Sequence, residues 1–221
     1  MVRKGPVGPF EGAAELQRRL AQEVRLCPLA GEPRLVAGVD CSDRDRTIRA
    51  AAVLLSWPEL TPAAEALFEG PCRVPYVPGF LSFRELDPMV RALEGLGMPF
   101  DLVMVDGCGI AHPRGLGIAS HLGVALNVPS LGISKSLLVG SFEEPGPDPL
   151  SIGPIWLNRS QVGWALRSRR GARPIFVTPG HMIDLEGALD VTLRALRGYR
   201  LPEPTRLADR LSKGPCQRKK R

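Results

Sequence analysis

Residues 101–136 read DLVMVDGCGIAHPRGLGIASHLGVALNVPSLGISKS and alternate between strand and helix. Residues 101–107 and 128–136 are rich in apolar and β-branched side chains, which is typical of buried strands. Residues 115–126 lie between them and have the pattern of a helix. Because strands that alternate with helices favour a sheet covered by helices, we expect an α/β protein.

The part of the chain before this block predicts one helix and then three strands. The helix is expected at 11–25, where apolar side chains recur every fourth residue. The three strands are joined by short polar turns, which favours an antiparallel meander. The first of them carries an acid, Asp40, near its end. The strands are expected at 35–42, 47–57 and 64–74.

The rest of the chain mixes helices and strands. Ser82 and Glu85 have the spacing of a capping box, which predicts a helix with Ser82 as its N-cap. The stretch EEPGPDP at 143–149 is expected to be a surface loop within one sheet. The order as a whole predicts a mixed sheet flanked by helices, in a single domain that spans 1–221. The remaining elements are helices at 82–96, 184–196 and 202–212, a hairpin at 153–168 and a strand at 174–178.

Composition and charge restrict the class of protein. Of the 221 residues, 44% are hydrophobic and 24% are charged, as in ordinary globular proteins. No apolar run reaches the ~18 residues of a membrane helix and no signal-peptide core is present, so we expect a cytoplasmic monomer without a membrane partner. The five cysteines form no CxxC pair and are expected to be scattered reduced thiols.

The net charge of +6 fits a polyanionic partner such as nucleic acid. The basic tail from about residue 213, KGPCQRKKR, contributes five of the cations. It is expected to be flexible and solubilising, or else to touch phosphate groups.

Two aspartates, Asp40 and Asp106, each end an apolar strand. Buried strands rarely carry acids unless these are paired or bind a cation. If the two strand ends lie close together, mutual repulsion raises the free energy of ionising both acids, and a divalent cation removes that repulsion. The alternative is that each acid caps the turn or helix after it. Two such acids in one chain favour the metal site.

Two further acids are weaker candidates when taken alone. Glu85 has a place in the capping box, and Asp209 lies between Arg206 and Arg210, where a surface ion pair is the alternative. Their order along the chain strengthens the case. Acids on a first strand, on a helix after a meander, on the next strand and on a C-terminal helix resemble the ribonuclease H-like fold. Such oxygen ligands suit Mg²⁺, for which Mn²⁺ can substitute, better than zinc.

Three histidines and a lysine are further candidates for functional residues. His112 follows Asp106 in the loop GCGIAHPRGLG, and His121 is expected to be a packed or capping residue in the next helix. His181 precedes a helix, where it either binds a phosphate or has a structural role. Lys135 ends a predicted strand, and beside two metal-binding acids its ammonium can hold a scissile phosphate or orient a water.

The loop PYVPG at 75–79 holds Tyr76 between two prolines. Prolines fix the backbone and keep it out of regular structure. A stiff aromatic loop of this kind suits insertion between bases or stacking on one. The alternative is a tight turn with a half-buried tyrosine.

Four stretches together resemble the endonuclease V family, the deoxyinosine 3′ endonucleases, over residues 36–212. The resemblance is specific, because few families other than this one would account for the long central block. It implies a ribonuclease H-like fold and Mg²⁺-dependent DNA repair. It also implies a nick at the second phosphodiester 3′ of an inosine-type lesion, which leaves 3′-hydroxyl and 5′-phosphate ends. The stretches are VAGVDCSD, PYVPGFLSFRE, the block 101–136 and GYRLPEPTRLADRLS.

The resemblance also assigns roles to residues of this chain. Cys108 departs from the family, which often has a large polar residue there, and this puts the lesion preference in doubt. The implied catalytic residues are Asp40, Glu85, Asp106, His112 and Lys135. The implied metal ligands are Asp40 and Asp106, with Glu85 and Asp209 as further candidates. The implied wedge consists of Pro75, Tyr76, Val77 and Pro78, and the implied base pocket of Gly79, Leu81, Gly107 and Ile118.

Three functions stay open at this point. The first is a lesion-specific nuclease that cuts deoxyinosine-containing DNA. The second is the same nuclease with inosine-containing RNA as its main substrate, since that choice can rest on a contact to a 2′-hydroxyl. The third is a non-catalytic nucleic-acid binder of the same fold. A non-catalytic binder would tend to lose a metal-binding acid or Lys135, and this chain keeps them.

Overall fold

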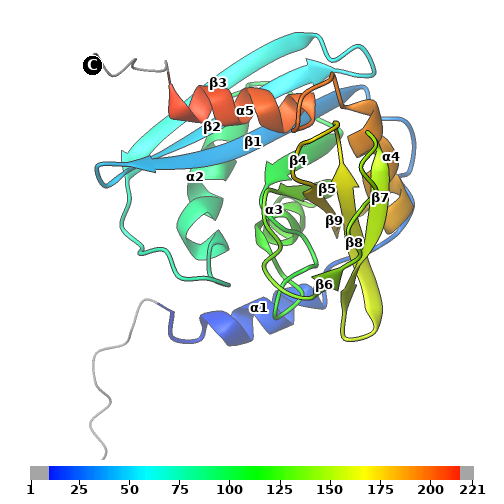
Figure 1. The fold of residues 1–221 in the computed structure, drawn as a ribbon. Coiled ribbons are helices and arrows are strands. Elements are labelled where there is room, and N and C mark those ends of the chain that lie inside the picture. The colour runs from blue at the N-terminus through cyan, green and yellow to red at the C-terminus, as the bar shows by residue number, and fades with distance from the viewer. Residues whose placement is uncertain (1–9, 215–221) are drawn as a thin grey trace, which may run out of the picture.

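The apolar runs of the sequence form one mixed sheet, which the computed structural model describes within residues 10–214 (Figure 1). The order of its strands is β3-β2-β1-β4-β5-β9-β8-β7-β6. The strands β1, β2 and β3 form the expected antiparallel meander. Their bounds are β1 (Leu35–Arg44), β2 (Thr47–Ser56), β3 (Pro62–Pro71), β4 (Leu102–Asp106), β5 (Ser130–Ser134), β6 (Ser141–Phe142), β7 (Ser151–Leu157), β8 (Ser160–Arg167) and β9 (Ile175–His181).

The centre of the sheet is parallel and its far half is antiparallel. β1 pairs in parallel with β4, and β4 with β5, whereas β9, β8 and β7 continue antiparallel from β5. In the register of β1 and β4, Val39 lies opposite Val105. The next residue on each strand is an aspartate, so Asp40 and Asp106 reach the same edge of the sheet side by side.

Helices cover both faces of the sheet, which confirms the predicted fold class. α2 (Ser82–Glu94) and α3 (Ile118–Leu126) pack on one face, over a core that includes Val39, Val105 and Leu122. α4 (Leu185–Arg194) and α5 (Glu203–Lys213) pack on the other face, over a core that includes Met104. α1 (Ala13–Ala21) lies outside these layers, against α3.

α5 approaches β1 closely enough to place its own acid at the sheet edge. A Cβ atom at Gly38 would overlap the backbone of Pro204, so only glycine permits this contact. The packing runs the length of α5, which crosses β1 and β2 in Figure 1. The close approach brings the last turns of α5 next to the end of β1.

Three expectations about helices need correction. The capping box is wrong, because Leu81 is the N-cap of α2 and the Ser82 hydroxyl is hydrogen-bonded to His121 Nδ1 at 3.0 Å. The helix expected from 115 begins at Ile118, because Gly117 is extended. α1 is shorter than 11–25, and its fully buried side chains are Ala13 and Gln17 rather than the predicted apolar stripe. The residues of that stripe, Leu16, Leu20 and Val24, are only half-buried.

Most of the predicted basic tail, residues 215–221, lies outside the described residues. None of the helices within 10–214 has the length and apolarity that a membrane crossing requires. The EEPGPDP stretch is irregular, as expected, and the short strand β6 just before it was not predicted.

Candidate active site

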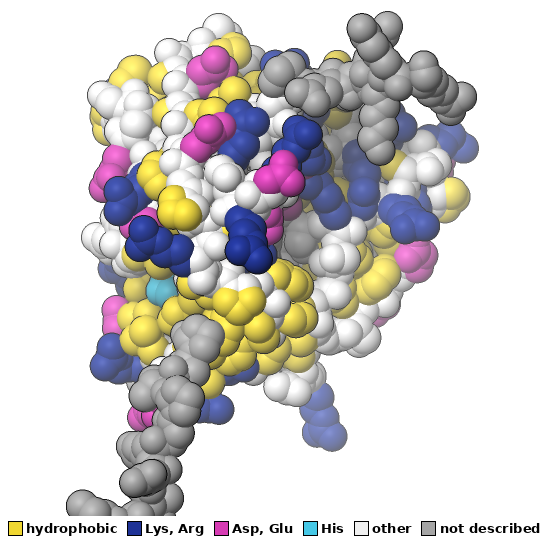
Figure 2. All heavy atoms as spheres, turned by 90° about the vertical axis from the view of Figure 1, so that its left-hand side faces the viewer, with side chains coloured by type: hydrophobic (Ala, Val, Ile, Leu, Met, Phe, Trp, Pro, Cys, Tyr) yellow, Lys and Arg dark blue, Asp and Glu magenta, His cyan; other side chains and the backbone are white. Residues whose placement is uncertain are grey.

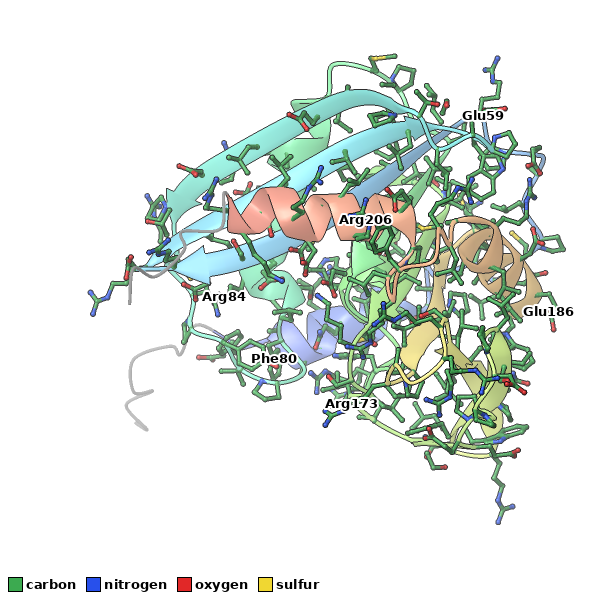
Figure 3. All side chains as sticks on the ribbon, turned by 45° about the horizontal axis from the view of Figure 1, so that its top comes forward. Glu59, Phe80, Arg84, Arg173, Glu186 and Arg206 are labelled. Atoms are coloured by element: carbon green, nitrogen blue, oxygen red, sulfur yellow. The ribbon has the colours of Figure 1, made fainter. Side chains whose placement is uncertain are left out.

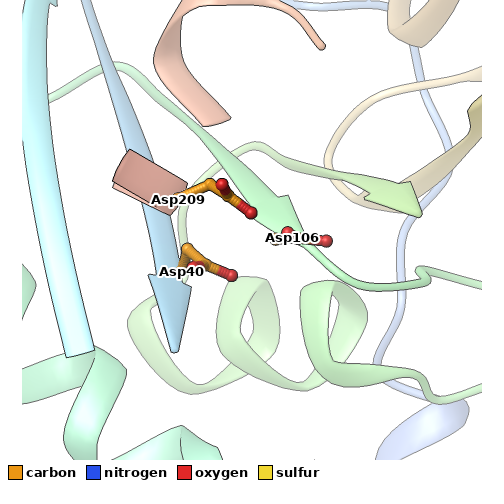
Figure 4. A group of neighbouring side chains, drawn as sticks. All are labelled: Asp40, Asp106 and Asp209. Atoms are coloured by element: carbon orange, nitrogen blue, oxygen red, sulfur yellow. The ribbon is translucent and has the colours of Figure 1, made fainter. Parts of the chain in front are cut away.

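Three aspartates converge at the edge where β1 and β4 end. Asp40 comes from β1, Asp106 is the last residue of β4, and Asp209 projects from α5. One carboxylate oxygen of each lies within 4.8 Å of one from each of the others. Figure 4 shows the three side chains pointing toward one another. We call these residues the acid cluster.

Asp40 is the most buried member of the acid cluster, with 6% of its surface exposed. Burial, followed by the charge of Asp106, raises the pKa of Asp40 well above its ordinary range. The hydroxyl of Ser212 donates to Asp40 Oδ2 at 2.6 Å and acts in the opposite direction. Asp40 therefore resists ionisation until positive charge comes close to it.

Lys135, just beyond the end of β5, supplies such a charge to the other two acids. Its Nζ lies 2.5 Å from Asp106 Oδ2 and 2.6 Å from Asp209 Oδ1. Burial lowers the pKa of Lys135, but the two carboxylates outweigh burial and hold the pKa above its ordinary value. Burial raises the pKa of Asp209, but hydrogen bonds to Lys135 and Lys213 and the charges of these lysines outweigh burial, so the pKa is lowered. Lys135 is thus a stable cation between two carboxylates.

Glu85 lies on the first turn of α2, beside the acid cluster but not among its three members. Burial raises the pKa of Glu85 to about 8. The positive charge of Arg84 opposes this increase, and the negative charges of Asp40 and Asp106 reinforce it. Arg84 itself is ion-paired with Asp43 on β1. Glu85 is therefore close enough to sense both aspartates and is poised to hold a proton near neutral pH.

The donor set of the acid cluster fits a hard divalent cation. All three side chains offer oxygen, and no histidine or cysteine in the described part of the chain joins them. Oxygen-only ligands suit Mg²⁺ or Mn²⁺, whereas zinc prefers nitrogen and sulfur. Burial and, after it, repulsion by Asp106 keep the pKa of Asp40 high, and a bound cation would offset both by favouring the ionised carboxylate.

A cavity of about 360 Å³ opens beside the acid cluster. This volume lies within the range of small-molecule sites. Asp106 and Lys135 line one side of it, so the acid cluster and the cavity share residues. All four residues of the predicted base pocket line it as well, namely Gly79, Leu81, Gly107 and Ile118. Cys108 also lines it, and burial raises the pKa of its thiol to about 11.

The pocket loop, residues 75–81, forms another wall of this cavity. It connects β3 to α2 without regular structure, at the left of Figure 1. Tyr76 lines the cavity, yet 57% of its surface is exposed. The structure thus presents an exposed ring rather than the half-buried tyrosine of the alternative interpretation. Figure 2 shows the face that carries this loop, with one continuous hydrophobic area and basic side chains above and beside it.

His112 faces the pocket loop rather than the acid cluster. Its Nδ1 accepts a hydrogen bond from the Arg114 backbone N–H at 3.2 Å, so the proton lies on Nε2, which donates to the Gly79 carbonyl at 3.1 Å. Burial lowers the pKa of His112 to about 4, so the ring is neutral at pH 7. The structure therefore places this predicted catalytic residue at the cavity wall.

The other two histidines lie apart from the acid cluster. His121 is packed in α3, as expected, where it contacts Ser82 and Phe83. His181 ends β9, is buried, and accepts a hydrogen bond from the Arg25 backbone N–H at 3.3 Å. Of the two roles that the sequence left open for His181, phosphate binding and a structural role, this contact supports the structural one.

Sequence reasoning missed several residues that hold the site. Ser212 could have been noticed, because it follows Asp209 by one helical turn. Gln17 gave no signal, because a glutamine on an amphipathic helix is typical of an exposed face.

A larger groove of about 570 Å³ lies between α5 and the strands β2 and β3, and its lining includes no member of the acid cluster.

Comparisons with known proteins agree with this geometry. A family model described as Endonuclease V matches residues 18–210. Endonuclease V of Xanthomonas axonopodis pv. citri is 53% identical, over 90% of this chain and 86% of the relative. The crystal structure of Endonuclease V from Streptomyces avermitilis is 40% identical with a TM-score of 0.86, and 92% of this chain and 91% of that one are covered.

A third similar protein was solved with nucleic acid. It is a variant of Ciona intestinalis Endonuclease V in complex with a 23mer DNA containing an inosine followed by a ribo-adenosine. Its sequence is 25% identical and its TM-score is 0.81, with 92% of this chain and 96% of that chain covered.

Proposed function

The chain belongs to the endonuclease V family and is a metal-dependent, nucleic-acid-binding phosphodiester hydrolase, and we propose that it cuts DNA at deoxyinosine. The proposed cut is at the second phosphodiester 3′ of the lesion and leaves 3′-hydroxyl and 5′-phosphate ends. The proposed metal is Mg²⁺, with Mn²⁺ as a substitute. The role is repair of deaminated purines.

One observation carries the proposal: the acid cluster and the cavity share a wall. Asp106 and Lys135 line the cavity and also belong to, or pair with, the acid cluster. A nucleotide whose base enters the cavity therefore has its backbone close to the acids. This supports a reaction in which recognition of the base and hydrolysis of a nearby phosphodiester take place in one site.

The pocket residues suit an extruded base. A base cannot be inspected inside a duplex, so it must leave the stack at a cost of a few kcal/mol. We assign Gly79, Leu81, Gly107 and Ile118 to the walls around that base, because all of them line the cavity. Tyr76, exposed at the same cavity, is assigned to the gap that the base leaves, with Pro75, Val77 and Pro78 holding its loop.

Asp40, Asp106 and Asp209 are the residues that would hold the cation. A bound Mg²⁺ supplies activation of a water and stabilisation of the leaving oxygen of a phosphodiester. Lys135 remains cationic at neutral pH and is placed to hold a phosphate oxygen or to orient the attacking water. Glu85 can accept a proton near neutral pH, which fits general acid–base work. Neutral His112 keeps the cavity wall in place.

The test is cleavage of matched strands that carry inosine, uracil, xanthine or an abasic site, each as DNA and as RNA, with Mg²⁺. We expect nicks at inosine in DNA, at the second phosphodiester on its 3′ side. Excess EDTA should abolish cleavage, Mg²⁺ or Mn²⁺ should restore it, and zinc alone should not. Preference for inosine in RNA would favour the endoribonuclease, and binding without cleavage would favour the non-catalytic binder.

We infer a single domain, because one sheet runs through the described residues, and a cytoplasmic monomer, as the sequence predicts. Light scattering on the purified protein tests the monomer. A stable dimer would contradict it.

A further inference from the structure

The carbonyl oxygen of Gly79 is the most heavily hydrogen-bonded atom of the pocket loop. It accepts from Gln17 Nε2 at 3.1 Å, from His112 Nε2 at 3.1 Å and from Arg114 Nη2 at 2.5 Å. A carbonyl oxygen has two lone pairs, so three donors saturate it. The adjoining N–H, that of Phe80, donates to Val77 O at 2.9 Å. Both ends of this peptide group are therefore fixed.

Gln17 of α1 is the buried centre of these contacts. Only 1% of its surface is exposed, and each end of its amide has a partner. Oε1 accepts from Arg114 Nε at 2.5 Å, while Nε2 donates to Gly79 O and, at 3.4 Å, to Leu116 O. An arginine can only donate, so the orientation of the amide is determined. Gln17 thus links the pocket loop to the loop before α3, on two sides of the cavity.

Aromatic and cationic contacts support the same link. The rings of Phe10 and Phe80 lie 5.0 Å apart, and the guanidinium of Arg114 lies 4.4 Å from the centre of the Phe80 ring. Figure 3 places Phe80 beside α1, below the sheet. Gly79 has a φ of +80°, which glycine adopts readily, so the loop needs outside contacts to stay in one shape. α1 and Arg114 provide those contacts.

We propose that Gln17 is a positioning residue that presets the pocket loop for the extruded base. Gln17 lines the cavity, but both ends of its amide are engaged by protein partners, so it acts through Gly79 O rather than through a hydrogen bond to the base. The inference rests on the proposed function of this cavity, because it concerns the loop that would receive the base. A loop ordered before binding does not lose conformational freedom when the base enters, and this favours binding without changing the chemical step.

The test uses single-turnover cleavage of a duplex with one inosine at rising enzyme concentrations. Gln17→Glu keeps the size and the acceptor for Arg114 but removes the donor to Gly79 O, and Gln17→Ala removes both. We expect the half-saturating enzyme concentration to rise about tenfold, the effect of one buried hydrogen bond, while the maximal rate changes less than about threefold. Binding to an inosine-free duplex, which depends on phosphate contacts, should not change.

Gln22 provides the matched control, because it lies exposed at the C-cap of the same helix. Gln22→Glu and Gln22→Ala should leave both kinetic parameters unchanged. Thermal melting of every variant shows whether it is folded, and Gln17→Glu replaces Gln17→Ala if the latter does not fold. Unchanged half-saturation in folded Gln17→Glu, or equal weakening on inosine-free DNA, would overturn the inference. If the wild type leaves inosine strands intact, the proposed function fails instead.

Discussion

The two halves of the site are held in place by different parts of the protein. The acid cluster lies on regular elements, where Asp40 and Asp106 end paired parallel strands and Asp209 belongs to a helix. The pocket loop has no regular structure and depends on side chains of α1 and of the loop before α3. The main chain therefore fixes the proposed chemistry, while long side chains fix the proposed recognition. Changes in the first half should lower the rate, and changes in the second should weaken selective binding.

Asp106→Ala should have the largest effect. Loss of one carboxylate from the acid cluster weakens binding of the cation. Cleavage of inosine DNA should therefore fall at least about a thousandfold. Binding should remain nearly intact, because negative charge near the phosphates is also removed. Single-turnover cleavage and a binding titration in Mg²⁺ measure the two effects. Asp87→Ala, at an exposed acid of α2, is the control. If binding is lost in step with cleavage, Asp106 organises the fold instead.

Lys135→Met should cause the second largest loss of cleavage activity. A preorganised charge beside a reacting phosphate contributes about a hundredfold or more in rate, so the maximal rate should fall by that factor. Lys213→Met is the matched control, because Lys213 also pairs with Asp209, at 2.7 Å, and with no other acid within residues 10–214. Cleavage by Lys213→Met should stay within about twofold of wild type, because exposed ion pairs contribute little free energy. Equal losses in the two variants would mean that Lys135 acts only by holding Asp209.

Tyr76→Ala tests the recognition half. Stacking of an aromatic ring on a base contributes about 1–3 kcal/mol, so duplex inosine substrates should bind and react at least about tenfold worse. Single-stranded inosine should lose less, because no duplex must be opened. Single-turnover kinetics on both substrates measure this difference. Tyr199→Ala is the control, since that ring is exposed against Arg206 and does not line the cavity. Equal losses on both substrates would restrict Tyr76 to packing of its loop.

The smallest expected effect is on stability. Asp40 and Glu85 have pKa values above their ordinary range, to about 8 for Glu85, so the folded protein holds their protons more tightly than the unfolded chain. In EDTA, the stability from these two groups is therefore full below about pH 4 and is lost as the pH rises toward 8. Other titratable groups also make the stability depend on pH. Thermal melting of wild type and Asp40→Asn across this pH window isolates the contribution of Asp40 from that of Glu85.

Asp40→Asn removes the buried charge while it keeps an acceptor for Ser212. Its melting temperature should exceed that of wild type by a few degrees at pH 8 in EDTA. Added Mg²⁺ should reduce this difference by stabilising the wild type alone. A difference that does not depend on pH or on Mg²⁺ would show that ionisation of the buried Asp40 does not lower the stability of the folded protein.

Much of the acid cluster could be predicted because it follows from a local pattern. An apolar strand that ends in an acid is visible in the sequence, and the parallel register brings two such ends together. The base-pocket and wedge residues came from the resemblance to a family. The four base-pocket residues and Tyr76 of the wedge line one cavity. The helix starts were less predictable. Ser82 has the spacing of a capping box, but its hydroxyl pairs with His121, a residue 39 positions away.

The sequence by itself determined the fold class, the meander and the strands that carry Asp40 and Asp106, because these depend on the periodicity of apolar side chains within short windows. Only the tertiary structure decided that Asp209 completes the acid cluster, that His112 faces the pocket loop and that Gln17 is buried beneath it. Gln17 lies 62 positions from Gly79 and 97 from Arg114. A buried amide is stable only where its donors and acceptor all find partners, and those partners meet only in the folded chain.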